Sequence, residues 1–283
     1  MGQPAGRQAG ARLRPADHDA AHARRCGLTS STPDALWSSR SVRVMRPTAV
    51  LARGLRRRAR GVALLDGVDL QIAVGARVLV VSHPEETARE LLRVLAGLSA
   101  LDGGSYQLAG LHRADDSPRG WARRVAYVPA ESGIYPWLSP REALELSARL
   151  AGYAGDERRR LVTDAVRRFR LDADLDRPIR RGGAPLEQRV ALAAALLSDP
   201  EVILLEDPLR SLEPAERARL LRPLVPRRTV LIASRYPASE AGLVNQVVLL
   251  DRGRVALHAE LADLERRGLP LSLRGIEAMV AGT

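Results

Sequence analysis

The stretch that decides the fold is RVLVVSHPEETARELLRVLAGL, residues 77–98. It opens with an apolar, valine-rich run at residues 78–81, which is typical of a strand buried on both faces. It closes with leucines and valines at helical spacing between Leu91 and Leu98. A strand that turns directly into a helix is the usual place for a phosphate-binding loop, so the sequence predicts that scaffold around residues 82–89.

The turn in this scaffold, SHPEETAR, lacks the residues that bind phosphate. A phosphate-binding loop needs glycines, whose backbone N–H groups approach the phosphate, and a lysine. The turn has no glycine, and the chain has no lysine, so all 44 basic residues are arginine. Ser82 and Glu85 instead have the spacing of a capping box, with Pro84 in the first turn, and Glu85 and Glu86 put negative charge at the helix N-terminus. These features favour a structural helix start over a phosphate cradle.

Composition limits the class of protein. The 283 residues, 46% of them hydrophobic, suffice for one large domain or a domain with a subdomain. No apolar run approaches the roughly 20 residues of a membrane span, and no N-terminal stretch resembles a signal peptide. The single cysteine, Cys26, excludes an internal disulfide framework, which suits the cytosol. We therefore expect a cytoplasmic protein, soluble or held at a membrane through a partner.

The net charge of +11 suggests an acidic partner such as nucleic acid, but codon bias towards arginine explains it as well. Only 3% of the residues are aromatic, so the arginines lack the stacking platforms of single-strand binders, and no nucleic acid is expected. Residues 1–44 lack hydrophobic periodicity and are predicted to be a disordered arm, so Met45 could be the true start. Within this arm, His18, His22 and Cys26 are spaced by four, which indicates chance more than a metal site.

Strands and helices alternate along the remaining chain. Strands are predicted within residues 48–76, 101–110 and 124–129, and again at 202–205, 229–234 and 246–250, the last with a hairpin partner. Helices are predicted from Pro140, from a cap at Asp156, at 186–197 and at 215–221. On the first helix, one inward face is predicted to comprise Ala143, Leu144, Ser147 and Leu150. This order predicts a mostly parallel sheet with crossovers and a helical insertion, about residues 131–185.

Six segments in this order resemble the ATP-binding subunit of an ATP-binding cassette (ABC) transporter over about residues 48–260. They are ALLDGVDL, LLRVLAGL, VAYVPAESGIYPWLSPREALEL, QRVALAAALLSDPEVILLEDP, SLEP and VVLLDRGRVA. The resemblance implies an α/β fold with a RecA-like, P-loop NTPase-type sheet, an antiparallel β subdomain and a helical subdomain facing a membrane permease. It implies a domain at residues 45–260, a helical tail at 261–283, and a dimer that holds ATP between the P-loop of one subunit and the signature loop of the other.

The positions that the family uses for nucleotide depart from its pattern. The P-loop lysine falls at Ala88 and the magnesium-binding hydroxyl at Arg89, while the adenine-stacking aromatic falls near Ala59. The loop glutamine falls at Ala130 and the switch histidine at Arg235. The degenerate P-loop comprises Ser82, His83, Pro84, Glu85, Glu86, Thr87, Ala88 and Arg89. The signature loop becomes Gly182, Gly183, Ala184, Pro185 and Leu186, in which the proline removes an N–H.

Two further groups of residues complete the candidate site. Glu206 and Asp207 resemble the family's strand-end pair of magnesium-binding and catalytic carboxylates in reversed order; either they are a relic that merely ends a strand, or they are a catalytic pair. Four residues that follow the glutamine position are candidates for contact with a partner: Tyr135, Pro136, Trp137 and Leu138. The alternative for Trp137 is a buried side chain that fills the helical subdomain.

These residues leave three functions open. The first is a degenerate subunit, non-catalytic or regulatory, that pairs with an intact ABC subunit and docks on a permease. The second is a working ATPase in which Arg89 or Arg77 replaces lysine, because a guanidinium binds phosphate bidentately. The third is a nucleic-acid-binding protein on the same fold. We favour the first, with weak or no binding of ATP and magnesium and no other cofactor or metal.

Overall fold

The computed structural model describes residues 47–113, 117–224, 228–240 and 242–267. All of them belong to a structural unit that begins at Met45. The predicted arm, including His18, His22 and Cys26, and most of the predicted helical tail lie outside the described residues. No described helix is both long and apolar enough to cross a membrane.

The strands form two sheets. The antiparallel sheet has the order β2-β1-β4-β5 and contains β1 (Thr48–Ala59), β2 (Val62–Ala73), β4 (Gly103–Leu108) and β5 (Leu111–His112). The second sheet has the order β10-β9-β3-β8-β7-β6 and contains β3 (Arg77–His83), β6 (Val125–Val128), β7 (Val202–Glu206), β8 (Thr229–Ala233), β9 (Gln246–Asp251) and β10 (Arg254–Glu260). Only β10 is antiparallel to its neighbour in this sheet, which confirms the predicted fold class.

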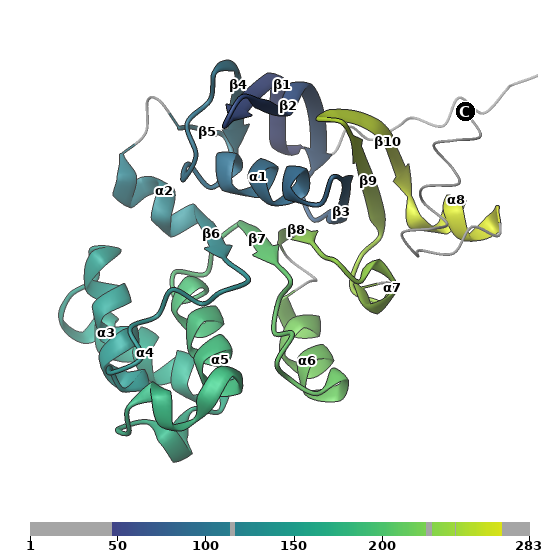
Figure 1. Cartoon of the computed structure of the whole chain (residues 1–283). Coiled ribbons are helices and arrows are strands. Elements are labelled where there is room, and N and C mark those ends of the chain that lie inside the picture. The colour runs from purple at the N-terminus through teal and green to yellow at the C-terminus, as the bar shows by residue number, and fades with distance from the viewer. Residues whose placement is uncertain (1–46, 114–116, 225–227, 241, 268–283) are drawn as a thin grey trace, which may run out of the picture. The chain divides into compact units, whose positions relative to one another are not determined.

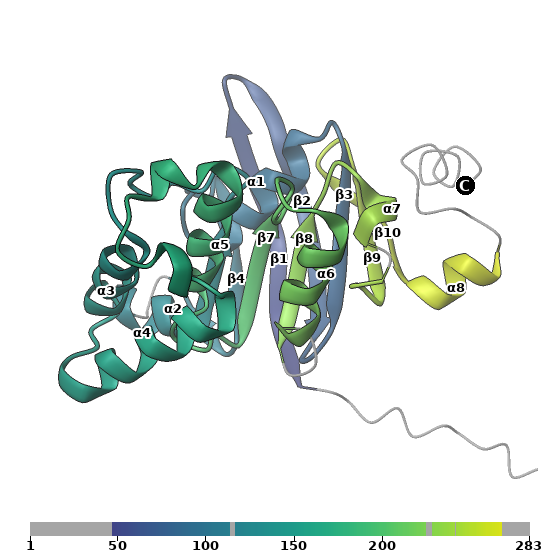
Figure 2. The ribbon, with the colours of Figure 1, turned by 90° about the horizontal axis from the view of Figure 1, so that it is seen from below.

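Helices connect the strands of the parallel sheet. Three of them lie together between β6 and β7: α3 (Pro140–Leu150), α4 (Gly155–Phe169) and α5 (Gly183–Ala195) (Figures 1 and 2). Helices α3 and α4 lie within the predicted helical insertion, and α5 is the helix predicted after it; we call the three together the helical insertion. The others are α1 (Glu86–Leu95) after β3, α2 (Pro118–Arg124) before β6, α6 (Pro214–Leu221) after β7, α7 (Pro237–Glu240) after β8 and α8 (Leu261–Arg266) after β10. Short 3-10 turns occur at Asp172–Asp174, Ile179–Arg181 and Arg222–Leu224.

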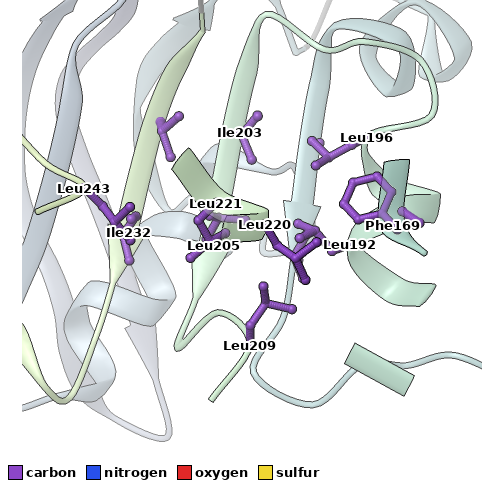
Figure 3. Packing of buried hydrophobic residues seen from close by; sticks show 14 of the residues in the cluster. Phe169, Leu192, Leu196, Ile203, Leu205, Leu209, Leu220, Leu221, Ile232 and Leu243 are labelled. Carbon is purple, nitrogen blue, oxygen red and sulfur yellow. The ribbon is translucent and has the colours of Figure 1, made fainter. Parts of the chain in front are cut away.

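The parallel sheet carries a separate apolar core on each face. In β3, Val78 and Val80 belong to the core that contains α1 and the antiparallel sheet, whereas Leu79 and Val81 belong to the core under α3–α6. The second core includes Phe169 of α4 beside Leu192 of α5 and Leu196, which follows α5 (Figure 3). The predicted burial of residues 78–81 on both faces is therefore confirmed.

One face of α3 was predicted incorrectly. Ala143 and Leu144 are buried as expected, but Ala148 completes the buried stripe and Leu150 is 70% exposed. Leu150 follows Ala148 by two positions, and each position turns the helix by about 100°, so Leu150 points roughly 200° away from Ala148 around the helix axis.

The start of α4 also differs from the prediction. The residue before the helix is Ala154, and no side chain caps it. Asp156 lies inside the first turn, where its carboxylate pairs with Arg159, so the predicted cap at Asp156 is wrong.

Candidate functional site

The turn between β3 and α1 is closed by the hydroxyl of Ser82. Strand β3 continues through His83, and Ser82 still pairs in register with Leu250, so Ser82 is too early to be the N-cap. The N-cap is Glu85, without a side-chain hydrogen bond, and the predicted capping box is wrong. Instead, the Ser82 hydroxyl donates to the carbonyl oxygen of Pro84 at 2.7 Å and accepts the backbone N–H of Ala88 at 2.8 Å. The backbone N–H of Ala88, the position at which the family has its lysine, is therefore already bonded within the turn.

Four charged residues meet above this turn. Arg89 Nη2 lies 2.7 Å from Glu85 Oε1 and 3.0 Å from Asp207 Oδ2. Arg235 Nε lies 3.0 Å from each of the same two oxygen atoms. We call these residues, Glu85, Arg89, Asp207 and Arg235, the ion cluster. Two guanidinium groups and two carboxylates alternate in it, so the cluster has no net charge and each cation already has two anionic partners.

The segments that build the ion cluster all end at one edge of the parallel sheet. Glu85 and Arg89 follow β3, Asp207 follows β7, and Arg235 follows β8. The backbone N–H of Arg235 also donates to Asp207 Oδ1 at 2.9 Å, and the hydrogen bond from its side chain to Asp207 raises the pKa of Arg235. The structure thus brings together four of the candidate site residues, whose mutual pairing was not predicted.

A small cavity of about 120 Å³ adjoins the ion cluster. Ligand pockets usually measure roughly 300–1,000 Å³, so this space is small for a nucleotide. The cavity brings together seven of the predicted residues: Ser82, His83, Glu85, Ala88, Arg89, Asp207 and Arg235. The other three positions of the degenerate P-loop are not in its lining. Of these, Pro84 and Glu86 are exposed and Thr87 is buried in α1.

The two strand-end carboxylates have different surroundings. Asp207 serves the ion cluster, and its backbone has a positive φ of 37°. Glu206 is 5% exposed and accepts the hydroxyl of Tyr127, on the neighbouring strand β6, at 2.7 Å. Burial raises the pKa of the Glu206 carboxyl, although the hydrogen bonds from Tyr127 and the Ala130 backbone partly oppose this rise. Tyr127 was not predicted from the sequence; its signal was a tyrosine within a strand otherwise made of apolar residues.

The remaining predicted positions lie apart from the ion cluster. The signature residues Gly182, Gly183, Ala184, Pro185 and Leu186 form the N-terminus of α5, and only Leu186 among them is buried. Ala130 and Ala184 line a separate open pocket. Ala59 ends β1 and is half-buried. Arg77 lies at the opposite end of β3 from the turn, so the prediction that Arg77 replaces the lysine is wrong.

The predicted partner contact presents two aromatic rings. Tyr135 and Trp137 are 53% and 61% exposed, and their ring centroids lie 5.1 Å apart. The N–H groups of Ile179 and Arg180 donate to the carbonyl oxygens of Leu138 and Pro136, which fixes the loop. The alternative of a buried Trp137 is wrong, because the loop rather than the ring packs on the helical insertion.

The residues present do not fit MgATP in the way that a P-loop does. A triphosphate would meet Glu85 and Asp207, and the two arginines beside them are already neutralised. Within the described ranges, no group of three or more histidines, cysteines or carboxylates is arranged to hold a metal ion.

Comparisons with known proteins agree with the fold and the order of the segments. Residues 89–210 match the family model described as ABC transporter. The lactose transport ATP-binding protein LacK of Rhizobium radiobacter is 29% identical over 219 residues, which cover 74% of this chain and 56% of LacK. The daunorubicin/doxorubicin resistance ATP-binding protein DrrA of Streptomyces peucetius is 25% identical over 78% of this chain and 68% of its own. The chain thus spans little more than half the length of the first of these relatives.

A solved structure gives the same result for the fold. The structure of an ATP binding subunit of an ABC transporter superposes with a TM-score of 0.72 at 22% identity, covering 83% of this chain and 100% of that chain. The resemblance stated from the sequence is therefore confirmed: in sequence and in fold, this chain is similar to the ATP-binding subunits of ABC transporters.

Proposed function

We propose that this chain is an ATP-binding-type subunit of an ABC transporter that does not hydrolyse ATP at its own P-loop position and acts as a structural or regulatory partner. The observation that carries this proposal is the ion cluster, which occupies the region where the family binds phosphate. Its arginines are each held by two carboxylates at 2.7–3.0 Å. A nucleotide would have to break these ion pairs and would leave Asp207, 4% exposed at its side chain, without its partners.

The backbone supports the same proposal. Helix N-termini bind phosphate through N–H groups that have no partner within the helix. Here the Ala88 N–H donates to Ser82 Oγ at 2.8 Å and the Thr87 N–H donates to the Pro84 carbonyl oxygen at 3.2 Å. These donors are no longer available, and Glu85 and Glu86 already compensate the helix dipole.

The proposed assembly is a heteromer with an intact ABC subunit and a permease at the cytoplasmic face of a membrane. A homodimer would pair two incomplete P-loops with two signature loops in which Pro185 lacks an N–H. An intact partner would supply the P-loop of the second site, so that ATP and magnesium bind chiefly through the partner. We propose that Tyr135 and Trp137 contact the permease, since exposed aromatic rings are enriched at protein interfaces.

One contact favours the alternative, a working ATPase with a non-consensus P-loop. Arg89 Nη2 lies 3.0 Å from Asp207 Oδ2, so a guanidinium and a carboxylate at the catalytic position are already neighbours. ATP hydrolysis by the purified chain separates the two functions. We expect no phosphate release above the rate without protein.

The control for this assay is an aspartate outside the site. If the purified chain hydrolyses ATP, and Asp207→Asn abolishes the activity while Asp176→Asn does not, the proposal is wrong. Asp176 suits this purpose because its side chain is 71% exposed and pairs with Arg141, on the helical insertion.

A further inference from the structure

A second and larger cavity, of about 620 Å³, lies beside α6 and α7. These two helices follow neighbouring strands of the parallel sheet, β7 and β8 (Figure 1). The volume falls within the roughly 300–1,000 Å³ that is usual for small-molecule sites. Asp207 and Ser234 line both this cavity and the one at the ion cluster, so they mark the boundary between the two.

Two residues of the cavity lining, Arg217 and Glu240, neutralise each other in an ion pair. Arg217 pairs with Glu240, which is 1% exposed, and Arg217 Nε donates to the Pro208 carbonyl oxygen at 2.8 Å. The Ser234 hydroxyl donates to the same Glu240 oxygen at 3.1 Å, whereas the Ser239 hydroxyl donates to the Tyr236 carbonyl oxygen at 2.7 Å. Arg217 is therefore held in place and offers little charge to a ligand.

Two other arginines in the lining are free to bind an anion. Arg210 and Arg222 are exposed, and neither side chain has an ion pair or hydrogen bond within the part of the chain that the structure describes. The carboxylates of this lining, Asp207 and Glu240, are already paired with Arg89, Arg235 and Arg217. The cavity thus has an excess of positive charge on two unpaired guanidinium groups.

The rest of the lining is apolar. Leu212 and Leu243 are 8% and 6% exposed, Pro214 also belongs to the lining, and Tyr236 is 69% exposed. A ligand that fills this cavity would bury apolar surface against the leucines while its charged group stays with the arginines. This combination selects an amphipathic ligand over a free inorganic ion.

We propose that this cavity binds a compact organic anion, with its carboxylate or phosphate group at Arg210 or Arg222, which flank α6, and its apolar body against Leu212, Leu243 and Tyr236. Guanidinium groups bind both kinds of oxyanion in bidentate geometry. This site is distinct from the P-loop position and adds ligand binding to the proposed structural or regulatory role.

The test measures binding of two probe anions, phenylacetate and phenyl phosphate, to the full chain by calorimetry. We expect at least one of them to bind. Phenylacetamide, which lacks the anionic group, and inorganic phosphate, which lacks the apolar body, should bind at least about tenfold more weakly. Binding of neither probe anion would overturn the proposal, as would equal binding of phenylacetamide. If only one anion binds, it identifies the preferred head group.

Variants locate the site. At least one of the substitutions Arg210→Ala and Arg222→Ala should weaken binding of the probe by about tenfold, which corresponds to the loss of one charge-assisted contact. The matched control is Arg219→Ala, on the same helix as the cavity-lining Arg217, since Arg219 is exposed, pairs with Glu216 and is not in the lining. Unchanged affinity in both lining variants, or an equal loss in Arg219→Ala, would contradict the assignment. All three side chains are at the surface, so the variants should retain the melting temperature of the unmodified chain.

Discussion

At the scale of single residues, Asp207 is a buried carboxylate held by two arginines. Its carboxylate accepts hydrogen bonds from the Arg235 backbone, the Arg235 side chain and Arg89, at 2.9–3.0 Å. A buried carboxylate is stable only with such partners. The aspartate thereby ties the segment after β7 to the segments after β3 and β8.

We expect Asp207→Ala to destabilise the protein by about 1–3 kcal/mol, because both arginines lose their buried partner. Chemical denaturation measures this change. The control is Asp156→Ala, whose side chain is 93% exposed and pairs only with Arg159, and for which the expected loss is below about 0.5 kcal/mol. Equal effects of the two substitutions would show that the ion cluster contributes no more than a surface pair.

Glu206 makes stability depend on pH. Burial raises its pKa in the folded state, so the folded protein keeps this proton to a higher pH than the unfolded chain does. Its favourable contribution is therefore present at low pH and is lost as the pH rises through the raised pKa. Glu206→Gln cannot ionise and still accepts the Tyr127 hydroxyl. The variant should be more stable than the unmodified protein at neutral pH, and the difference should vanish below about pH 4, near the ordinary glutamate pKa. A constant difference across this range would contradict the assignment.

At the scale of elements, the two leucines on α3 give a matched test of the buried face. Leu144 is fully buried and Leu150 is 70% exposed on the same helix. Leu144→Ala should cost about 2–5 kcal/mol of stability, as for other core leucines, whereas Leu150→Ala should cost less than about 0.5 kcal/mol. The two unfolding midpoints in denaturant provide the comparison. A large loss of stability in Leu150→Ala would show instead that Leu150 belongs to the buried face, as predicted from the sequence.

The turn between β3 and α1 shows where sequence patterns stop being informative. The apolar run at residues 78–81 and the leucines of α1 predicted a strand and a helix, because burial imposes their periodicities. The S-x-x-E spacing also fits a capping box, but that motif requires the strand to end before Ser82. Ser82 pairs with Leu250 on β9, about 170 residues away, and therefore belongs to the strand and not to the helix cap. Such a long-range contact is not visible in the local sequence.

At the scale of the whole molecule, the order of the apolar segments predicted the mostly parallel sheet and the helical insertion, whereas the antiparallel sheet was implied by the resemblance alone. The resemblance also singled out Asp207, Arg89 and Arg235, which follow parallel strands that end at one edge of the sheet. The partners of these charges did not follow, because Glu85, Asp207 and Arg235 are separated by up to 150 residues and long side chains have many rotamers. Tyr127 and the second cavity escaped for the same reason.

The division of the chain at Met45 has a direct consequence. We expect a chain that begins at Met45 to melt at the same temperature as the full chain, because residues 1–44 lack the apolar periodicity needed to add to a core. Calorimetric scans of the two proteins test this expectation. A lower melting temperature for the shorter chain would show that the first 44 residues pack on the rest.

If the ion cluster takes the place of phosphate binding at the P-loop position, the purified chain does not bind MgATP there. A calorimetric titration of the purified chain with MgATP measures this binding. We predict no saturable binding in the micromolar range, for the unmodified chain and for Asp176→Asn alike. A micromolar dissociation constant that Arg89→Ala abolishes would contradict the claim, because Arg89 would then hold a phosphate in place of Glu85 and Asp207.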